Sequence, residues 1–433
     1  MQGIALPDLE VRLQHRYLSL VDSHMQVASQ LAAGISTLPS VNRAFAATQA
    51  AWRFLNNERV SLPILVEPLR EAGRTALAAS SAGFALLVHD WCKLSYGHPS
   101  KRDRAQFTHA HDIGYELTSA LLVDAAQGHP IALMEMHLKT AEGVLSTRTP
   151  APADVGHLEQ VLPTMEASGT WKLSQPLLHV IDREADSVDH YRAWDQAGHY
   201  YLIRGDNRSV LHEGQETTLE KVHETLREKA SFRSAGQVQY QGRPARLFVA
   251  ETLVVLHRPA KKNVGGRRYE KPGPPLTLRL IIAEVRADDG RVLASWFLLT
   301  NAPADWATAE QLAQCYYYRW RIESFFKLLK SHGHQLEQWQ QETGIAIARR
   351  LLLAAMACVV VWRLQADESP PAKELQNVLV RLSGRQIKRG HPPTAPALLA
   401  GLHALLAVLA LLDQYDLQQL KSLLHQNAGG PSG

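Results

Sequence analysis

Two short apolar runs, each followed directly by an aspartate, constrain the fold of this chain most. Residues 84–89 are Phe-Ala-Leu-Leu-Val-His before Asp90, and residues 177–181 are Leu-Leu-His-Val-Ile before Asp182. Short continuous apolar runs are typical of strands that are buried on both faces by covering helices. The sequence therefore predicts an α/β fold in which both aspartates stand at strand ends, where functional side chains of such folds collect.

The rest of the central segment predicts a mixed sheet. Further strands are expected at 116–124, 131–138 and 199–204, and helices near 153–165 and 184–197. The resulting order, β-β-β-α-β-α-β, is that of a mixed α/β sheet. Residues 206–300 then alternate apolar and polar side chains around a Pro- and Gly-rich turn at 271–275. This pattern predicts a β-rich insertion with one helix at 217–229.

Helical patterns flank this sheet in the sequence. We predict a helical domain over 1–78, a catalytic domain over 79–345 and a helical C-terminal region over 346–433, in which apolar faces could pair two copies of the chain. The apolar runs 351–362 and 395–412 are expected to be buried helices. The first is shorter than the roughly 20 residues that cross a bilayer, and Pro396 and Gly401 interrupt the second.

Composition limits the class of protein. The 433 residues include 46 Lys and Arg against 42 Asp and Glu, a net charge of +4, with 45% hydrophobic residues. These values exclude collagen-like and fully disordered chains. The three cysteines are far apart, and the first thirty residues lack a secretion signal, so we predict a cytoplasmic protein without structural zinc.

A long helix is predicted over 307–331, and one face of it carries four polar residues. At about 100° per residue, the side chains that share an arc of some 60° are Tyr316, Arg319, Glu323 and Lys330. The stripe is about 21 Å long, enough to follow several phosphates of a DNA strand. Arg319 and Glu323 also fit an ordinary i,i+4 surface ion pair, and periodicity alone does not separate the two interpretations.

The same four residues, spaced Tyr316-x2-Arg319-x3-Glu323-x6-Lys330, resemble the signature of the bacterial DDE transposases of the IS-four insertion-sequence family. Four other segments are similar to that family, and together they extend the resemblance over nearly the whole chain: Trp52 to Asn57, Leu94 to Tyr96 after Asp90, Asp182 to Asp186, and Trp296 to Thr300. One departure is Trp91, where the family usually has a small residue.

The resemblance implies an RNase H-like catalytic core, an N-terminal helical DNA-binding domain and a homodimer that acts on paired transposon ends. It also implies cut-and-paste transposition: nicking, hairpin formation on the end, hairpin opening, and strand transfer into target DNA. The chain would thus be an endonuclease and a strand transferase. The alternatives are a catalytically silent DNA-binding protein derived from a transposase and a general metal-dependent nuclease of the same fold.

Three acids are the predicted catalytic residues and metal ligands: Asp90, Asp182 and Glu323. Carboxylates gathered in an apolar crevice repel one another unless hard divalent cations neutralise them, so we predict two Mg²⁺ or Mn²⁺ ions. Such a pair activates a water or a 3′-hydroxyl and stabilises the leaving oxygen in an in-line phosphoryl displacement. Arg319 and Lys330 would hold DNA phosphates, with a further hydrogen bond from Tyr316.

The resemblance assigns roles to other residues. Trp296 would stack on a flipped base and Arg204 would lie near the DNA, although a core tryptophan and a surface arginine are the plain alternatives. In the N-terminal domain, Trp52 and Phe54 are expected in the core, with Arg53 and either Asn56 or Asn57 free to contact DNA. The remaining expectations are phosphate contacts by Lys261 and Lys262 and support of the metal-binding Asp182 by Arg183, Glu184 and Asp186. The last two acids also suit the first turn of a helix for electrostatic reasons alone.

Overall fold

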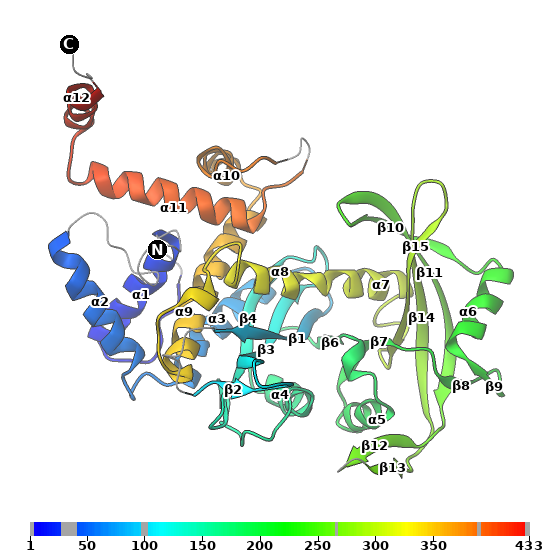
Figure 1. Ribbon diagram of the computed structural model, residues 1–433. Helices are drawn as coiled ribbons and strands as arrows, with labels where there is room; N and C mark the ends of the chain where they lie inside the picture. Colours follow the sequence, from blue (N-terminus) through cyan, green and yellow to red (C-terminus); the bar gives the residue numbers. More distant parts are fainter. Residues whose placement is uncertain (1–3, 27–40, 97–102, 265–266, 388–390, 429–433) are drawn as a thin grey trace.

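The computed structural model describes residues 4–26, 41–96, 103–264, 267–387 and 391–428 of the chain. In them, a 13-stranded mixed sheet runs through most of the molecule, with helices on both faces (Figure 1). Its strands are β1 (Ala85–Ser95), β2 (Ala105–Gln106), β3 (Ile113–Asp124), β4 (Pro130–Lys139), β5 (Val144–Ser146), β6 (Leu177–Ile181), β7 (Tyr200–Gly205), β8 (Ser209–His212), β9 (Gln215–Thr218), β10 (Arg233–Tyr240), β11 (Arg243–Leu256), β14 (Leu276–Arg286) and β15 (Val292–Thr300). A separate hairpin pairs β12 (Ala260–Val264) with β13 (Arg267–Lys271).

One half of the sheet has the strand order β5-β4-β3-β1-β6-β7. The pairs of β1 with β3 and of β3 with β4 are antiparallel, whereas β6 lies parallel to β1 and β7 lies parallel to β6. This arrangement confirms the predicted mixed α/β sheet. The parallel strands are the short apolar runs recognised in the sequence, and both of their faces are covered.

The other half is the β-rich segment after residue 206, and it continues the same sheet. β15 pairs antiparallel with β7, and β14, β11, β8 and β9 follow in order. The predicted helix of this segment is α6 (Leu219–Glu228). The insertion is therefore an extension of the central sheet and not a detached lobe.

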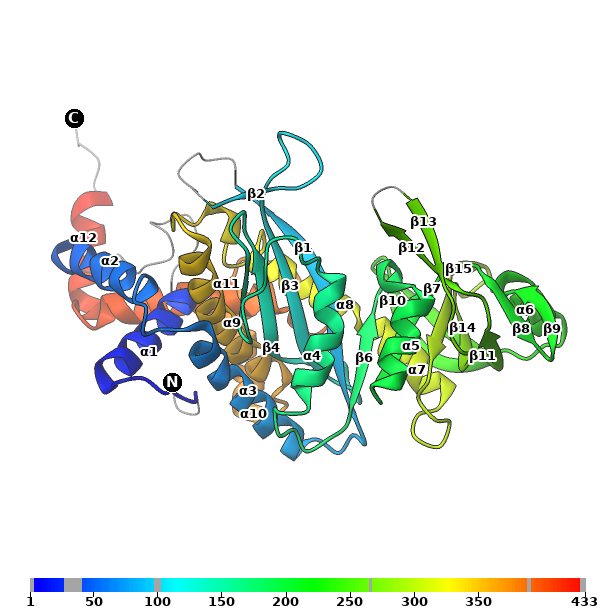
Figure 2. The same cartoon turned by 90° about the horizontal axis from the view of Figure 1, so that it is seen from below.

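Alternate residues of the strands face two separate cores. In β6 and β7, Val180 and Leu202 contribute to the larger core, while Ile181 and Ile203 contribute to the smaller one. This alternation follows from the two-residue repeat of a strand. The smaller core lies beneath α4 (Val161–Ser168), α5 (Val188–Gln196) and α6, and Figure 2 shows α4 and α5 together on the near side of the sheet.

The N-terminal helices and α9 (Gly344–Ala366) belong to the larger core. The N-terminal helices are α1 (Val11–Gln26), α2 (Val41–Leu55) and α3 (Leu62–Ala79). Both α3 and α9 pack on β4. The buried guanidinium of Arg349 on α9 donates to the carbonyl oxygens of Leu55, at 2.7 Å, and Val60, at 2.6 Å. The N-terminal helices thus share one continuous core with the sheet.

The segment predicted as one helix over 307–331 is two helices. α7 (Ala309–Tyr318) contacts β11 and β14, α8 (Trp320–Leu329) contacts β1, and Arg319 lies at the junction between them. The remaining helices are α10 (Pro370–Leu382), α11 (Ala395–Leu412) and α12 (Leu417–Ala428).

Two helices in the described part of the chain are long and apolar enough to cross a membrane. In the first, α9, 89% of the most apolar 18-residue window is buried within the protein, as expected for a core helix. In the second, α11, only 22% of the corresponding window is buried, so the prediction that it is a buried helix is wrong. Its first turns pack through Leu398 and Leu399, whereas Leu409 and Leu412 near its end are exposed.

Candidate active site

The two predicted aspartates lie side by side. The parallel register of β1 and β6 pairs His89 with Ile181, so that Asp90 and Asp182 come next on neighbouring strands. Asp182 follows the end of β6, as predicted, but Asp90 does not follow a strand end. β1 continues to Ser95 by pairing with β3, with Asp90 opposite Ser119. The side chain of Asp90 still reaches the end of the neighbouring strand, because it and Asp182 both contact Arg319.

Local backbone contacts hold both carboxylates. Asp182 Oδ1 accepts a hydrogen bond from the Arg183 amide at 2.7 Å, and Asp90 Oδ1 accepts one from the Trp91 amide at 2.9 Å. Asp182 caps a short 3-10 turn over Arg183–Ala185, and α5 begins only at Val188, so the helix predicted at 184–197 is divided. Each aspartate therefore keeps its second oxygen, Oδ2, for another partner.

Arg319 joins these two aspartates to Glu323, the third predicted acid. Its Nη1 lies 3.1 Å from Asp90 Oδ2, and its Nη2 lies 3.4 Å from Asp182 Oδ2 and 2.7 Å from Glu323 Oε1. The arginine is buried, with 5% of its surface exposed. The predicted phosphate contact of Arg319 is thus replaced in this structure by a bond to all three acids, which converge on one cation.

Burial and the charge of Arg319 act in opposite directions on the acids. Burial raises the pKa of Asp90 to about 6, and the attraction of Arg319 only partly offsets it. Burial also raises the pKa of Asp182, but the Arg319 charge and the hydrogen bonds from the Arg183 amide and Tyr316 outweigh it and lower that pKa overall. The cluster thus contains acids in different environments around a single positive charge.

The other two residues of the predicted stripe also contact protein. Tyr316 is buried, and its hydroxyl donates to Asp182 Oδ1 at 3.0 Å. Lys330 Nζ donates to the Lys93 carbonyl at 2.8 Å and lies 3.1 Å from Glu337. In this structure both side chains are directed to protein groups, and their contacts with DNA phosphates stay predictions.

Trp296 lies in β15 and is 7% exposed. Its ring meets that of Tyr316 edge-on, with centroids 5.4 Å apart, so it belongs to the core, which was the plain alternative. It also lines a cavity of about 350 Å³ together with Tyr240, Tyr317 and Trp320. The indole therefore combines a packing contact with access to an aromatic cavity beside the acid cluster.

Arg204 was predicted to lie near the DNA. It lies in β7 opposite Leu298 and is half-buried, and its positive charge is one of the contributions that lower the pKa of Asp182. Burial raises the pKa of Tyr316, and the Arg204 charge opposes that shift only in part. The structure thus brings Arg204 close to the acid cluster.

The three residues after Asp182 all have protein partners. Arg183 pairs with Asp206 at 3.3 Å, and Asp186 accepts from the Asp206 amide at 2.7 Å and pairs with Arg208. Glu184 accepts a hydrogen bond from the Trp91 indole at 3.0 Å. These contacts fix the 3-10 turn on both sides, and the support of a metal-binding Asp182 by the three residues stays a prediction.

His157 is a neighbour of the site that sequence reasoning missed. Its Nε2 lies 3.1 Å from Glu184 and its Nδ1 lies 3.1 Å from Glu116. Burial lowers the pKa of His157, but its hydrogen bonds to Glu116 and Glu184 and their negative charges raise it overall. No local signal marks this histidine, since its partners are 41 and 27 residues away in the sequence.

The N-terminal residues predicted to contact DNA lie away from the acids. Arg53 is exposed near the end of α2, and Asn56, also exposed, donates to the Trp52 carbonyl at 2.9 Å. Phe54 is buried as predicted, but Trp52 is 66% exposed, so its assignment to the core is wrong. Helix periodicity explains both outcomes, because residues two apart face different sides.

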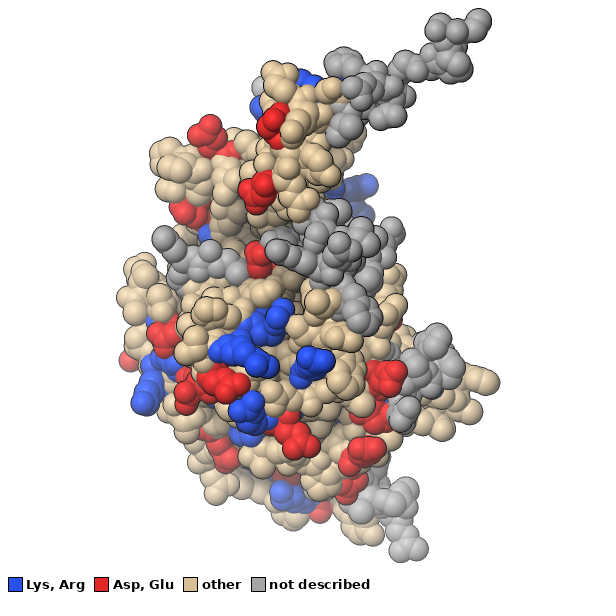
Figure 3. Space-filling model, turned by 90° about the vertical axis from the view of Figure 1, so that its left-hand side faces the viewer, with Lys and Arg blue, Asp and Glu red and all other residues tan. Residues whose placement is uncertain are grey.

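A cavity of about 480 Å³ separates α1 from α2 near Arg53. We call its cationic lining the basic groove, formed by Arg12, His15, Arg16 and Arg53. Figure 3 views the molecule from the side of these helices and shows Lys and Arg side chains gathered there. Lys261 and Lys262, the other predicted phosphate contacts, lie in β12, and their side chains are outside the described residues.

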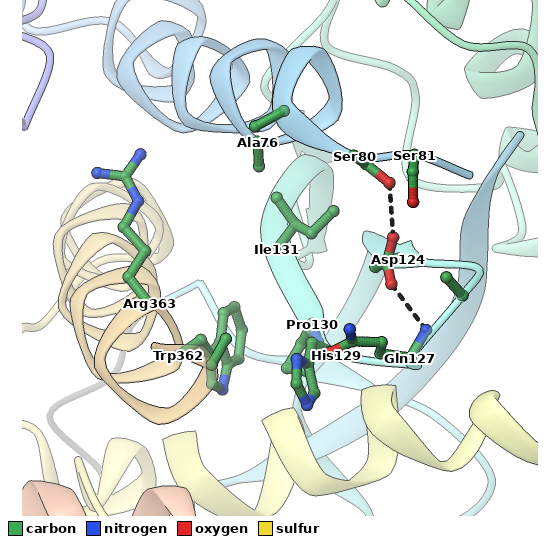
Figure 4. Close-up of a pocket in the computed structure, with 13 residues that line it drawn as sticks. Ala76, Ser80, Ser81, Asp124, Gln127, His129, Pro130, Ile131, Trp362 and Arg363 are labelled. Atoms are coloured by element: carbon green, nitrogen blue, oxygen red, sulfur yellow. Dashed lines mark hydrogen bonds between the residues drawn. The ribbon is translucent and has the colours of Figure 1, made fainter. Parts of the chain in front are cut away.

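Another pocket, of about 430 Å³, lies at the opposite end of β1, where Ala85 pairs with Asp124. Asp124 accepts hydrogen bonds from Ser80 Oγ at 3.0 Å and from the Gln127 amide at 2.7 Å, and Trp362 and Arg363 line the other wall (Figure 4). None of the predicted site residues lines this pocket, so it is distinct from the acid cluster.

Within the described residues, no group of three or more His, Cys, Asp or Glu side chains is arranged to hold a metal ion. The chemistry of the acid cluster nevertheless fits one. Mg²⁺ and Mn²⁺ prefer carboxylate oxygens, and oxygens from Asp90, Asp182 and Glu323 already meet at a single cation, the Arg319 guanidinium.

One comparison with known proteins, a family match, agrees with this chemistry. A family described as "Transposase DDE domain" matches residues 123–360, more than half of the chain. The match includes Asp182 and Glu323 and begins after Asp90. Among solved structures, a cryo-EM structure of the piggyBac transposase synaptic complex with hairpin DNA aligns with 96% of this chain and 74% of its own, at 9% identity and a TM-score of 0.34. A similarity at that level is too low to support any shared detail.

Proposed function

The chain belongs to the transposase DDE domain family, and we propose that it is the metal-dependent transposase of an insertion sequence, of the IS-four type. The signature Tyr316-x2-Arg319-x3-Glu323-x6-Lys330 supports the narrower assignment. The strand order β4-β3-β1-β6-β7, with three antiparallel strands followed by two parallel ones, supports an RNase H-like core.

One observation carries the proposal: the carboxylates of Asp90, Asp182 and Glu323 converge on one cation although they come from a strand, a strand end and a distant helix. These three side chains would hold Mg²⁺ or Mn²⁺, most simply as two ions. When bound, such ions supply an activated water or 3′-hydroxyl and stabilise the leaving oxygen. The Arg183 amide and Tyr316 orient Asp182, and the Trp91 amide orients Asp90.

We propose that the reaction is cut-and-paste transposition through a hairpin on the transposon end. The cavity beside Trp296 supports this route, because its four aromatic rings offer stacking surfaces for an extruded base. Arg204 lies near Asp182 and would contact the DNA strand there. Duplex DNA next to the end would bind the basic groove through Arg53 and its other cationic residues, with Asn56 following in the sequence.

We further propose that the chain works in the bacterial cytoplasm as a homodimer on paired ends. The exposed apolar end of α11, with Val408, Leu409 and Leu412, supports a contact between two copies. Sedimentation of the purified chain with and without end DNA tests the dimer.

The test of the function is cleavage of a plasmid that carries the DNA flanking this gene. We expect nicks at the junction between element and flank that require Mg²⁺ or Mn²⁺ and are lost in Asp182→Asn. A general nuclease of the same fold would cut without preference for the junction. A catalytically silent DNA-binding protein, which the contact of Arg319 with all three acids favours, would bind the junction and leave it intact.

A further inference from the structure

Arg319 occupies the place where the three carboxylates meet. Both of its terminal nitrogens are used, Nη1 by Asp90 and Nη2 by Asp182 and Glu323. Its Nε is buried and has no hydrogen-bond partner among the described residues. A buried donor without a partner is unfavourable, so the guanidinium is held by strong ion pairs but is incompletely satisfied.

The charges of the cluster do not balance. Three carboxylates surround one guanidinium, and Arg204 adds a positive charge that acts on Asp182. Lys330 is directed to Glu337 and the Lys93 carbonyl instead. Like charges gathered in a partly buried site repel one another, and additional positive charge relieves the repulsion. A divalent cation on the same oxygens would satisfy this need, but it would stand within a few ångströms of the Arg319 charge and repel it.

Arg319 has a route out of the cluster. It lies between α7 and α8, and its Cζ is 5.7 Å from the centre of the Trp320 ring, which is 48% exposed. A long arginine side chain can move its charged end toward solvent while its stem stays packed, and the indole face offers a cation–π contact on the way. Once outside, the guanidinium is a bidentate phosphate ligand.

We propose that Arg319 and the divalent cation are alternative partners of Asp90, Asp182 and Glu323, and that cation binding frees Arg319 to bind a DNA phosphate. This inference rests on the proposed function. It also reconciles the phosphate contact expected from the sequence with the buried arginine in the structure, because the two belong to different states of one side chain.

The exchange couples metal binding to DNA binding. If the cation releases Arg319 for DNA, then DNA that captures Arg319 must favour the cation by the same factor. In the absence of DNA, Arg319 competes with the cation and weakens its binding. Removal of the guanidinium should therefore strengthen metal binding to the free protein and abolish the coupling.

The first arm of the test is calorimetric titration of the full chain with Mn²⁺ in the absence of DNA. We expect Arg319→Ala and Arg319→Gln to bind Mn²⁺ more tightly than the unaltered protein, by about tenfold, within the usual range of coupling between two sites. Lys327→Ala is the matched control, because Lys327 is an exposed cation on the same helix, and it should bind Mn²⁺ as the unaltered protein does.

The second arm measures the affinity for flanking DNA with and without Ca²⁺. We expect Ca²⁺ to raise the DNA affinity of the unaltered protein and of Lys327→Ala, but not that of the two Arg319 variants. Equal or weaker Mn²⁺ binding by both Arg319 variants overturns the exchange, and the metal-dependent function then still stands. Absence of Mn²⁺ binding by every protein, Lys327→Ala included, overturns both.

Discussion

His157 stacks on the indole of Trp91, with ring centroids 4.1 Å apart and the planes inclined by 23°. The indole nitrogen of Trp91 also donates to Glu184, which His157 contacts in turn. Trp91 departs from the pattern of the family that the sequence resembles, which usually has a small residue at this position. The contacts with His157 and Glu184 fix the position of its indole ring. The triad of Trp91, His157 and Glu184 therefore ties β1 to the turn that carries Asp182.

His157 should contribute to the stability of the folded protein in a way that depends on pH, and His157→Gln should remove that contribution. The folded-state pKa of His157 is raised above its usual value, so its contribution is complete below the unfolded pKa of about 6.5 and is lost as pH rises through the folded value. Thermal melts from pH 6 to pH 9 should show a difference between the two proteins of about 1–3 kcal/mol at low pH that shrinks at high pH. A difference that stays constant with pH would mean that His157 acts only by packing.

Glu184→Gln tests the same triad from its other side. Glutamine can still accept from the Trp91 indole but carries no charge, so the pH dependence due to His157 should weaken while the indole contact persists. The indole contact is followed by tryptophan fluorescence. The signal of Trp91 is the difference between the spectra of Glu184→Gln and of the double variant that carries both Glu184→Gln and Trp91→Phe. Unchanged pH dependence would assign the raised pKa of His157 to Glu116 alone.

Neutralising any one of the three acids should abolish metal-dependent nicking and leave DNA binding largely intact. Asp90→Asn, Asp182→Asn and Glu323→Gln each remove one carboxylate from the point where the three converge. Asp305→Asn, which alters an exposed acid before α7, is the control and should cleave normally. More than a few per cent of residual cleavage in one variant would remove that acid from the catalytic set.

The parts of the site that depend on short stretches of sequence were predictable, and those that depend on distant pairing were not. Asp182 was located because an apolar strand ends directly before it. The extension of β1 past Asp90 depends on pairing with β3, about 30 residues later, and nothing near Asp90 signals it. The one-residue interruption at Arg319 was missed for a similar reason. No Gly or Pro interrupts the helical pattern there, and two of the acids that bind Arg319, Asp90 and Asp182, come from distant parts of the chain.

The burial of a segment was predicted correctly only where its sequence pattern is compatible with a single environment in the fold. The first part of β1, residues 85–88, and most of β6 are apolar and buried, and their core residues were identified. α9 and α11 are both apolar, yet α9 lies in the core and α11 lies mostly outside it. Hydrophobicity alone does not separate these two helices, because exposure depends on the position of each helix relative to the sheet.

Lys330→Ala should affect stability more than DNA binding. Because Lys330 is directed to Glu337 and the Lys93 carbonyl, its loss should cost about 1–3 kcal/mol and leave the salt dependence of DNA affinity unchanged. A phosphate contact, as the sequence alone suggests, would instead reduce the log–log slope by about 0.9. Urea melts and DNA binding at several salt concentrations distinguish the two roles.

Trp296 joins a packing role to a proposed stacking role, and two substitutions separate them. Trp296→Ala should destabilise the protein by about 3–5 kcal/mol, because it removes a buried ring that meets Tyr316 edge-on. Trp296→Phe keeps an aromatic face toward the cavity shared with Tyr240, Tyr317 and Trp320, and should recover much of that loss.

If a base enters this cavity during hairpin formation, Trp296→Phe should retain hairpins. Trp296→Leu, which fills space without a π face, should nick normally and accumulate nicked ends. Gel analysis of the two products beside thermal melts of each variant decides between the roles. Hairpins that form equally well in Trp296→Leu and Trp296→Phe would leave Trp296 as a core residue alone.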